Sequence, residues 1–299
     1  MQFPAKILLF GEYGLILGGS GLVIPYSKYS GELKFGAVFS ESQSFQSHQS
    51  ITHLFDYLTS KSLQFSFLNL QRFKRDLEKR IWFDANIPFG YGLGSSGALI
   101  AAIYDRYVNN KSRDLVLVKQ QLAAMESYFH GSSSGVDPLV SFVKQSLILQ
   151  GIGAVEILED WSISQLGLAV FLVDTGEKSK TISLVDWFKA QMTKPDFKKR
   201  TEKDFLGVNE LVVNTVKASK PVAIDELLKI SRYQLDYLSP MVPESFRSHF
   251  FAGLNSGNFA FKLCGSGGGG FMLCLANNEK LAVDYLAKAN LPFQKIETR

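Results

Sequence analysis

The sequence predicts an α+β fold, in which strands and helices are built around one or two hydrophobic cores. Three observations support this prediction. Apolar strand-like segments begin the chain, segments with helical apolar spacing occupy its middle, and strand-like segments flank a glycine run near its end. The chain has 299 residues, of which 46% are hydrophobic, so it can fill one large domain or two modest ones.

The first part of the chain predicts a β-rich layer. Residues 5–26, AKILLFGEYGLILGGSGLVIPY, contain two short apolar strands separated by glycine-rich turns, and SGELKFGAVF (30–39) continues with a third strand in an alternating pattern. Helix-compatible apolar spacing follows over residues 50–77, and IWFDANIPF (81–89) is extended. The fold is therefore expected to begin with strands.

Two helices are predicted in the middle of the chain. The small and aliphatic side chains of residues 98–108 indicate a buried helix. Residues 114–130 predict a second helix, because their apolar side chains recur on one helical stripe. The stripe consists of Leu115, Val118, Leu122, Met125 and Phe129.

A cluster of polar turn residues at 160–165 is the candidate domain boundary. It separates a predicted N-terminal domain, residues 1–165, from a predicted C-terminal domain, residues 166–299. The second domain begins with the apolar strand 166–176. Several helices then lead to a strand, a glycine loop and another strand at 261–275.

Composition and charge argue against several classes of function. The net charge of +4 comes from basic and acidic residues scattered along the chain, which speaks against nucleic-acid binding. Residues 85–104 are uncharged, but Pro88 and a glycine cluster disfavour a membrane span. Cys264 and Cys274 lack metal-ligand spacing and are expected to be buried thiols. We therefore expect a cytoplasmic protein without nucleic-acid or membrane partners.

A glycine-rich loop leads directly into the predicted helix of residues 98–108. Glycines allow the unpaired N–H groups at a helix start to wrap around an anion such as phosphate, and Ser95 or Ser96 could cap the helix or reach a magnesium ion. A tight turn with a cap is the alternative, and the Walker pattern is absent because serine follows Gly94. The loop comprises Gly90, Tyr91, Gly92, Leu93, Gly94, Ser95, Ser96 and Gly97.

Three charged residues and a second glycine run are further candidates. Glu126 borders the apolar stripe of its helix and is expected to have a partner, although a solvated carboxylate is the alternative. Asp137 follows the flexible GSSSG segment and could simply cap a helix, and Lys6 could be an edge-strand lysine. The run GSGGGG (265–270) exceeds what a turn needs, so another segment is expected to approach its backbone closely.

Together these segments resemble the GHMP kinase superfamily, which includes galactokinases, homoserine kinases, mevalonate kinases and phosphomevalonate kinases. Three motifs carry the resemblance in the family's order: PAKILLFGEYGLILGG (4–19), IPFGYGLGSSGA (87–98) and KLCGSGGGG (262–270). MESYFHGSSSGVDP (125–138) is most similar to the mevalonate kinase branch, in which a glutamate precedes an aspartate by eleven residues.

The resemblance implies a two-domain kinase with a ribosomal-protein-like N-terminal domain and a ferredoxin-like C-terminal domain. It would transfer the γ-phosphoryl group of ATP to the primary hydroxyl of mevalonate, with Mg²⁺, for isoprenoid synthesis. The loop from Gly90 to Gly97 would wrap the ATP phosphates. Asp137 would be the catalytic carboxylate, with Lys6 beside it to stabilise its charge. Ser96 and Glu126 would hold the magnesium ion.

The resemblance also implies residues on the acceptor side and a supporting loop. Glu12, Tyr13 and Thr181 fall at substrate-side positions, and Gly265, Gly267 and Gly268 belong to a loop that stabilises the catalytic loop. Tyr13 departs from the family, which typically carries histidine there, and Ser133 stands where proline is common. These departures make the acceptor less certain than the reaction type.

Two alternatives stay open. One is the same chemistry on another small alcohol, namely phosphomevalonate, homoserine or a sugar. A phosphorylated acceptor would need additional cations, for which Lys28, Lys178 and Lys180 are candidates. The other is a non-catalytic regulator with this fold, whose signature would be a missing catalytic or metal-binding residue. The resemblance also leaves a homodimer open.

Overall fold

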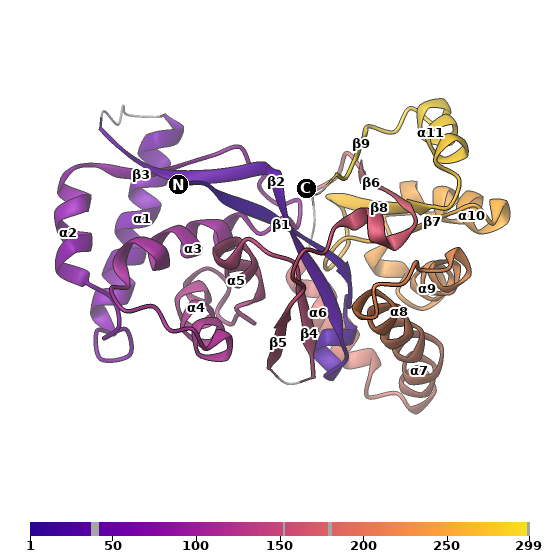
Figure 1. Ribbon diagram of the computed structural model, residues 1–299, viewed down its shortest axis with the longest axis horizontal. Coiled ribbons are helices and arrows are strands. Elements are labelled where there is room, and N and C mark those ends of the chain that lie inside the picture. The colour runs from indigo at the N-terminus through magenta and orange to yellow at the C-terminus, as the bar shows by residue number, and fades with distance from the viewer. Residues whose placement is uncertain (37–41, 152, 179–180, 298–299) are drawn as a thin grey trace. The chain divides into compact units, whose positions relative to one another are not determined.

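The computed structural model combines helices with two sheets of strands, which confirms the predicted α+β class (Figure 1). Apolar side chains of both kinds of element are buried in the interior. The structure describes residues 1–36, 42–151, 153–178 and 181–297.

The chain divides into two compact units that are interleaved along the sequence. Each unit therefore combines segments that are far apart in the chain. The predicted boundary after residue 165 cuts the chain only once, and it stays a prediction about domains. Unit 1 comprises Met1–Lys6, Pro25–Phe89 and Leu93–Gln145, and unit 2 comprises Ile7–Ile24, Gly90–Gly92 and Ser146–Arg299.

Strand β2 (Gly21–Phe35) corrects the prediction of separate second and third strands, because it runs without a break. Different partners hold its two ends. Gly21–Val23 pairs with β4, whereas Gly31–Phe35 pairs with β3 in antiparallel register. A Cβ on Gly31 would lie 2.2 Å from the ring of Phe83, so glycine lets the strand continue where a turn was expected. The strand order is β1-β2-β4-β5, with β3 also paired to β2. The remaining bounds are β1 (Phe3–Phe10), β3 (Ile81–Ala85), β4 (Leu147–Gln150) and β5 (Ala154–Ile157).

The helices of unit 1 follow the predicted apolar spacing. The helical spacing predicted over residues 50–77 corresponds to two helices, α1 and α2. Residues 98–104 of α3 are all buried, and α3, α4 and α5 pack against one another (Figure 1). Helix α4 begins after Asp114, whose carboxylate accepts a hydrogen bond from Val116 N at 2.9 Å. The bounds are α1 (Gln43–Ser60), α2 (Leu70–Glu78), α3 (Ser95–Tyr107), α4 (Leu115–His130) and α5 (Val136–Val143).

Unit 2 contains an antiparallel sheet with the strand order β7-β8-β6-β9. Along the chain its elements follow the order β-α-β-β-α-β, with several helices at the first crossover. This order and pairing are ferredoxin-like, as the sequence analysis predicts. Both cysteines are buried: Cys264 directly follows the edge strand β7, and Cys274 lies in the central strand β8. The strands are β6 (Ala169–Asp174), β7 (Phe259–Leu263), β8 (Phe271–Ala276) and β9 (Phe293–Lys295).

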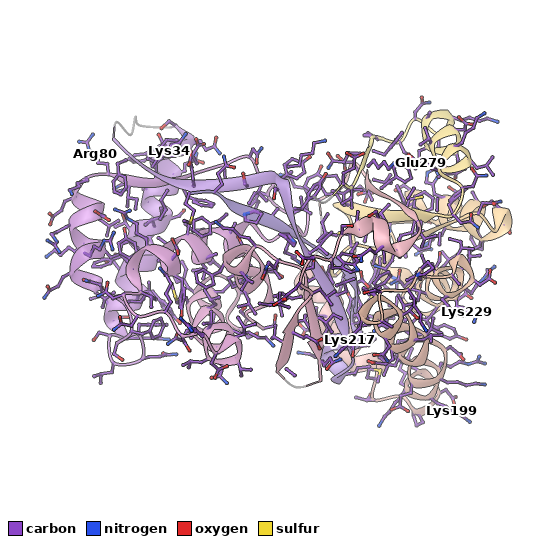
Figure 2. All side chains as sticks on the ribbon, in the orientation of Figure 1. Lys34, Arg80, Lys199, Lys217, Lys229 and Glu279 are labelled. Carbon is purple, nitrogen blue, oxygen red and sulfur yellow. The ribbon has the colours of Figure 1, made fainter. Side chains whose placement is uncertain are left out.

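Helices α9 and α10 pack against β7 with their apolar sides, while charged side chains point outward. Lys199 of α7 and Lys229 of α9 project from the ribbon in Figure 2. None of the helices in the described part of the chain combines the length and apolar character that a bilayer crossing requires. The helices are α6 (Thr181–Gln191), α7 (Pro195–Arg200), α8 (Gly207–Lys217), α9 (Ile224–Tyr237), α10 (Arg247–Ser256) and α11 (Glu279–Lys288). Short 3-10 or π turns are η1 (Gly14–Leu17), η2 (Ile163–Leu166), η3 (Thr201–Leu206), η4 (Ser239–Met241) and η5 (Glu244–Phe246).

Candidate active site

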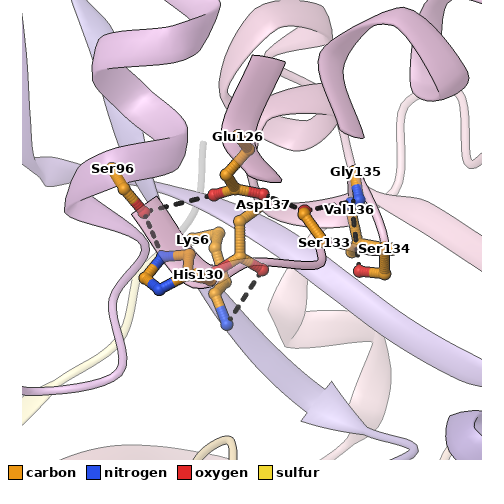
Figure 3. A network of polar contacts seen from close by, with 9 residues as sticks. All are labelled: Lys6, Ser96, Glu126, His130, Ser133, Ser134, Gly135, Val136 and Asp137. Atoms are coloured by element: carbon orange, nitrogen blue, oxygen red, sulfur yellow. Dashed lines mark hydrogen bonds and ion pairs between the residues drawn. The ribbon is translucent and has the colours of Figure 1, made fainter. Parts of the chain in front are cut away.

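Lys6 and Asp137 form an ion pair within unit 1 (Figure 3). Lys6 Nζ lies 3.2 Å from Asp137 Oδ1, and only 8% of Lys6 is exposed. The backbone N–H of Lys6 donates to Leu93 O at 3.0 Å, which ties β1 to the glycine-rich loop. Lys6 is therefore a buried, paired cation next to that loop, on a strand that lies at the edge of its sheet.

Asp137 lies in the first turn of α5, two residues after the N-cap position. Gly135 occupies the N-cap in a left-handed conformation. Ser141 Oγ donates to Pro4 O at 2.7 Å, so α5 is also fixed to the strand that carries Lys6. The carboxylate of Asp137 therefore faces Lys6 and does not cap α5.

Two glycines of the loop allow its backbone to pass directly against this ion pair. A Cβ on Gly94, where φ is +73°, would lie 3.1 Å from both Asp137 Oδ2 and Lys6 Cγ. A Cβ on Gly97 would lie 2.8 Å from Asp137 Cβ. Any side chain at Gly97 would therefore displace the catalytic candidate, which explains why this part of the loop is glycine.

The start of α3 presents backbone N–H groups beside Asp137. Gly94 is the N-cap, so within the described structure no side chain caps this helix, and the predicted capping role of Ser95 or Ser96 is wrong. The first N–H groups of a helix have no carbonyl partner inside the helix and carry a partial positive charge. This end of α3 is therefore suited to a phosphate group.

Glu126 and Ser96 meet across unit 1, as Figure 3 shows. Ser96 Oγ donates to Glu126 Oε1 at 3.2 Å, and it also lies 3.1 Å from His130 Nε2. Ser133 Oγ donates to the other carboxylate oxygen, Glu126 Oε2, and accepts from Gly135 N at 3.0 Å. Only 3% of Glu126 is exposed, which confirms the expectation that it is buried and has a partner.

The sequence analysis did not identify His130 and Ser133 as contacts of this pair. His130 lies one helical turn after Glu126, a spacing that puts both side chains on one face of α4. That spacing could have revealed His130. The contact of Ser133 depends on the turn after α4, for which apolar periodicity gives no signal.

The pKa of Glu126 is raised to about 7, mainly by burial and also by the nearby charge of Asp137. Hydrogen bonds from Ser133 and Ser96 and the charge of Lys6 act in the opposite direction. The carboxylate therefore ionises close to neutral pH, where a bound cation would stabilise its charged form.

The oxygen atoms of Ser96 and Glu126 fit a magnesium ion. A hydroxyl and a carboxylate 3.2 Å apart are hard ligands of the kind that Mg²⁺ prefers. Among the residues that the structure describes, no three His, Cys, Asp or Glu side chains form a metal site by themselves. In a typical magnesium site, water and substrate phosphates supply most of the ligands.

Glu12 belongs to unit 2, where it forms a buried ion pair with Lys262 of β7. Only 2% of Glu12 is exposed, and Lys262 Nζ also donates to Leu263 O at 2.8 Å. The ammonium group lies 5.6 Å from the centre of the Phe10 ring. The sequence analysis missed Lys262, although a lysine in an apolar strand is the signal that singled out Lys6.

Tyr13 is also buried in unit 2, with only 5% of it exposed. Its hydroxyl donates to Ser266 O at 2.6 Å, and its ring lies 4.7 Å from that of Phe188. Its φ of +59° is unusual for a residue other than glycine. Thr181 is the first residue of α6, its side chain lies outside the described part of the structure, and Lys180 lies outside the described residues.

The glycine run Gly265–Gly270 is approached closely by other backbone segments of unit 2, as predicted. A Cβ on Gly267 would lie 2.5 Å from Met241 O, and one on Gly270 would lie 3.0 Å from Tyr91 Cα. A Cβ on Gly92 would lie 3.2 Å from Cys264 O. Residues 90–92 of the glycine-rich loop therefore lie against the glycine run. Gly265 and Gly268 of the glycine run have positive φ angles of +90° and +74°.

Comparison with known proteins identifies related sequences. The family model described as "GHMP kinases N terminal domain" matches residues 62–145. The mevalonate kinase of Pyrococcus abyssi is 27% identical over 313 aligned residues, which cover 94% of this chain and 89% of that protein. The mevalonate kinase of Archaeoglobus fulgidus is 22% identical, with 98% of both chains covered.

Solved structures share the fold over nearly the whole chain. The Lin0012 protein of Listeria innocua has a TM-score of 0.71 at 14% identity, covering 100% of this chain and 97% of its own. The mevalonate kinase of Methanococcus jannaschii has a TM-score of 0.64 at 18% identity, covering 100% and 98%. The phosphomevalonate kinase of Streptococcus pneumoniae, solved with phosphomevalonate and AMPPNP, has a TM-score of 0.68 at 14% identity, covering 99% of each chain.

Proposed function

We propose that the chain is a GHMP kinase that phosphorylates the primary hydroxyl of mevalonate, because residues 62–145 match the family model of the GHMP kinase N-terminal domain and the curated relatives are mevalonate kinases. GHMP kinases are ATP-dependent small-molecule kinases. The ion pair of Lys6 and Asp137, held directly against the glycine-rich loop, is the observation that carries the proposed chemistry. The product would be phosphomevalonate, a precursor for isoprenoid synthesis in the cytoplasm.

Asp137 is proposed to orient the acceptor hydroxyl and to accept its proton as the bond to phosphorus forms. Lys6 Nζ, 3.2 Å away, pairs with the carboxylate and is proposed to stabilise the oxygen that attacks. Little covalent chemistry is required of the protein, because phosphoryl transfer depends mainly on positioning and on neutralising charge. A rigid pair on β1 and α5 suits this task.

The loop from Gly90 to Gly97 and the start of α3 are proposed to bind the phosphates of ATP through backbone N–H groups. Ser96 and Glu126 would hold Mg²⁺, which neutralises charge on the phosphate oxygens when it is bound. A bound cation would stabilise the charged form of Glu126 and would thereby offset the rise in pKa that burial causes.

Glu12, Tyr13 and Thr181 are proposed to lie on the acceptor side, as the family resemblance implies. Glu12 is neutralised by Lys262, so its contribution would be to shape that side and not to act as a base. Thr181 at the start of α6 offers a hydroxyl. Direct contact of these residues with mevalonate is a prediction for a complex with the acceptor.

An acceptor panel tests the proposed function. ADP release is measured with ATP, magnesium and either mevalonate, phosphomevalonate, homoserine, galactose or no acceptor. Turnover with mevalonate alone is expected. Turnover with another acceptor only would keep the mechanism but overturn the proposed substrate, and equal ADP release without acceptor would reveal an ATPase.

Phosphomevalonate is the second candidate acceptor, because the phosphomevalonate kinase of Streptococcus pneumoniae shares the fold at a TM-score of 0.68. A second phosphate group would need additional cations. Lys28 of unit 1 and Lys178 of unit 2 are exposed and available for such a role. A non-catalytic regulator is disfavoured, because Lys6, Asp137 and Glu126 are all present.

A further inference from the structure

Tyr13 occupies a position at which the family typically carries histidine, yet its side chain is used inside unit 2. The phenol hydroxyl donates to Ser266 O at 2.6 Å, which joins the turn after β1 to the glycine run before β8. These two segments are 253 residues apart in the chain. A histidine ring is shorter than a tyrosine side chain and would not bring a donor as far.

The geometry around Tyr13 favours a fixed position for its hydroxyl. Its ring packs on Phe188 at 4.7 Å between centroids, and only 5% of the residue is exposed. Its backbone adopts a positive φ of +59°, a strained conformation that persists only where the surroundings enforce it. Burial and the charge of Glu12 raise the pKa of Tyr13, so the hydroxyl stays protonated and remains a donor.

The glycine run that receives this hydrogen bond supports part of the phosphate loop. Tyr91 packs its ring 5.0 Å from that of Phe271, and its backbone lies close enough to Gly270 that no side chain would fit between them. Gly92 is similarly close to Cys264 O. Residues 90–92 therefore depend on the shape of the glycine run.

Backbone hydrogen bonds from Gly268 and Gly270 also hold the glycine run. Gly268 N donates to Met241 O and Gly270 N to Glu177 O, both at 2.6 Å. The hydrogen bond from Tyr13 reaches Ser266, near the beginning of the run. The hydrogen bond from Tyr13 therefore acts on the part of the run that follows Cys264, which lies next to Gly92.

We propose that Tyr13 is a positioning residue for nucleotide binding: its hydroxyl fixes the glycine run, and the run in turn fixes residues 90–92 of the phosphate loop. This inference rests on the proposed function only where it assigns residues 90–92 to ATP. It gives Tyr13 a role in addition to, and separable from, the acceptor contact that the family resemblance implies.

The test compares Tyr13→Phe, which removes one hydroxyl, with Tyr233→Phe as the matched control. Tyr233 is buried in the same unit, and its hydroxyl also makes a 2.6 Å hydrogen bond, to Thr201 Oγ1. Amide hydrogen exchange of residues 264–270 is measured by mass spectrometry on the protein without ligands. Exchange is expected to accelerate on the order of fivefold in Tyr13→Phe, the factor for loss of one hydrogen bond, and to be unchanged in Tyr233→Phe.

Kinetics then separate the nucleotide from the acceptor. The KM for ATP is expected to rise on the order of fivefold in Tyr13→Phe, while the KM for the acceptor changes less than twofold. Tyr13→His, which restores the family residue, is expected to behave like Tyr13→Phe. A higher acceptor KM in Tyr13→Phe that Tyr13→His restores, with unchanged exchange, would overturn the proposal in favour of an acceptor contact.

Failure of the proposed function would look different. A protein that turns over none of the acceptors gives no KM, but the exchange of residues 264–270 still responds to Tyr13→Phe if the hydroxyl fixes the run. Binding of ATP and magnesium, measured by calorimetry, then replaces the KM. Equal exchange and equal ATP affinity in Tyr13→Phe and the wild type would refute the inference regardless of the acceptor.

Discussion

Replacing Glu126 with glutamine should stabilise the folded protein while weakening its use of magnesium. Raising the pKa of this carboxyl from its ordinary value of 4.5 to about 7 corresponds to about 3 kcal/mol of lost stability at high pH. This penalty is absent below pH 4.5, grows as the pH rises from 4.5 to about 7, and is complete above that pH. Glutamine keeps the shape and carries no charge, so it avoids this loss.

The hydrogen bonds around the side chain reduce the expected gain. Ser96 and Ser133 both donate to the carboxylate, and an amide can accept from only one of them on its oxygen, which costs about 1 kcal/mol. Glu126→Gln should therefore be more stable than the wild type by about 2 kcal/mol at pH 8, with the difference shrinking or reversing at pH 5.

Urea denaturation followed by circular dichroism at pH 5, 6, 7 and 8 measures this difference. Glu78→Gln is the matched control, because it makes the same chemical change at an exposed site of unit 1 and should stay within about 0.5 kcal/mol of the wild type. The magnesium concentration for half-maximal turnover should rise more than about tenfold in Glu126→Gln, equivalent to about 1.4 kcal/mol. A stability difference that is the same at pH 5 and pH 8 would refute the argument from burial. An unchanged magnesium requirement would make the carboxylate structural.

Three other substitutions test the remaining contacts. Asp137→Asn should lower kcat at least about a hundredfold with ATP affinity nearly unchanged, and a near-normal kcat would remove Asp137 from catalysis. Gly97→Ala should lose about 1–3 kcal/mol of stability in urea denaturation, because its Cβ would lie 2.8 Å from Asp137, whereas Gly207→Ala in an uncrowded helix should lose none. Lys262→Met should destabilise the protein by about 3–5 kcal/mol by leaving Glu12 buried without its partner. Adding Glu12→Gln should recover part of that loss, and equal stability of the single and double variants would contradict the argument.

Local patterns in the sequence predicted most helices and strands, because apolar periodicity reports which face of an element is buried. The helix of residues 114–130 and the strands around the glycine run follow from such patterns. The continuity of β2 did not, because the polar residues near its middle look like a turn and only the pairing with β3 and β4 keeps the strand extended. Strand pairing depends on residues distant in the chain, which local patterns do not report.

The candidate site was predictable to the extent that glycines and charges stand out from their surroundings. Lys6 and Asp137 could be singled out separately, but only the family resemblance joined them. Contacts that depend on turn geometry, such as Ser133 with Glu126, or on the partner of a buried charge, such as Lys262 with Glu12, required the structure. Periodicity contains no information about which polar atoms meet.

The interleaving of the two units has a consequence for synthesis on the ribosome. Gly21 of β2 pairs with Leu149, so the N-terminal segment of unit 2 must wait for 128 further residues before this partner exists. At about 5–20 residues per second, translation leaves this apolar segment without its partner for roughly 6–25 seconds. Slow codons or a holding chaperone within that interval would therefore affect the yield of native protein more than the same measures applied after β4 has emerged.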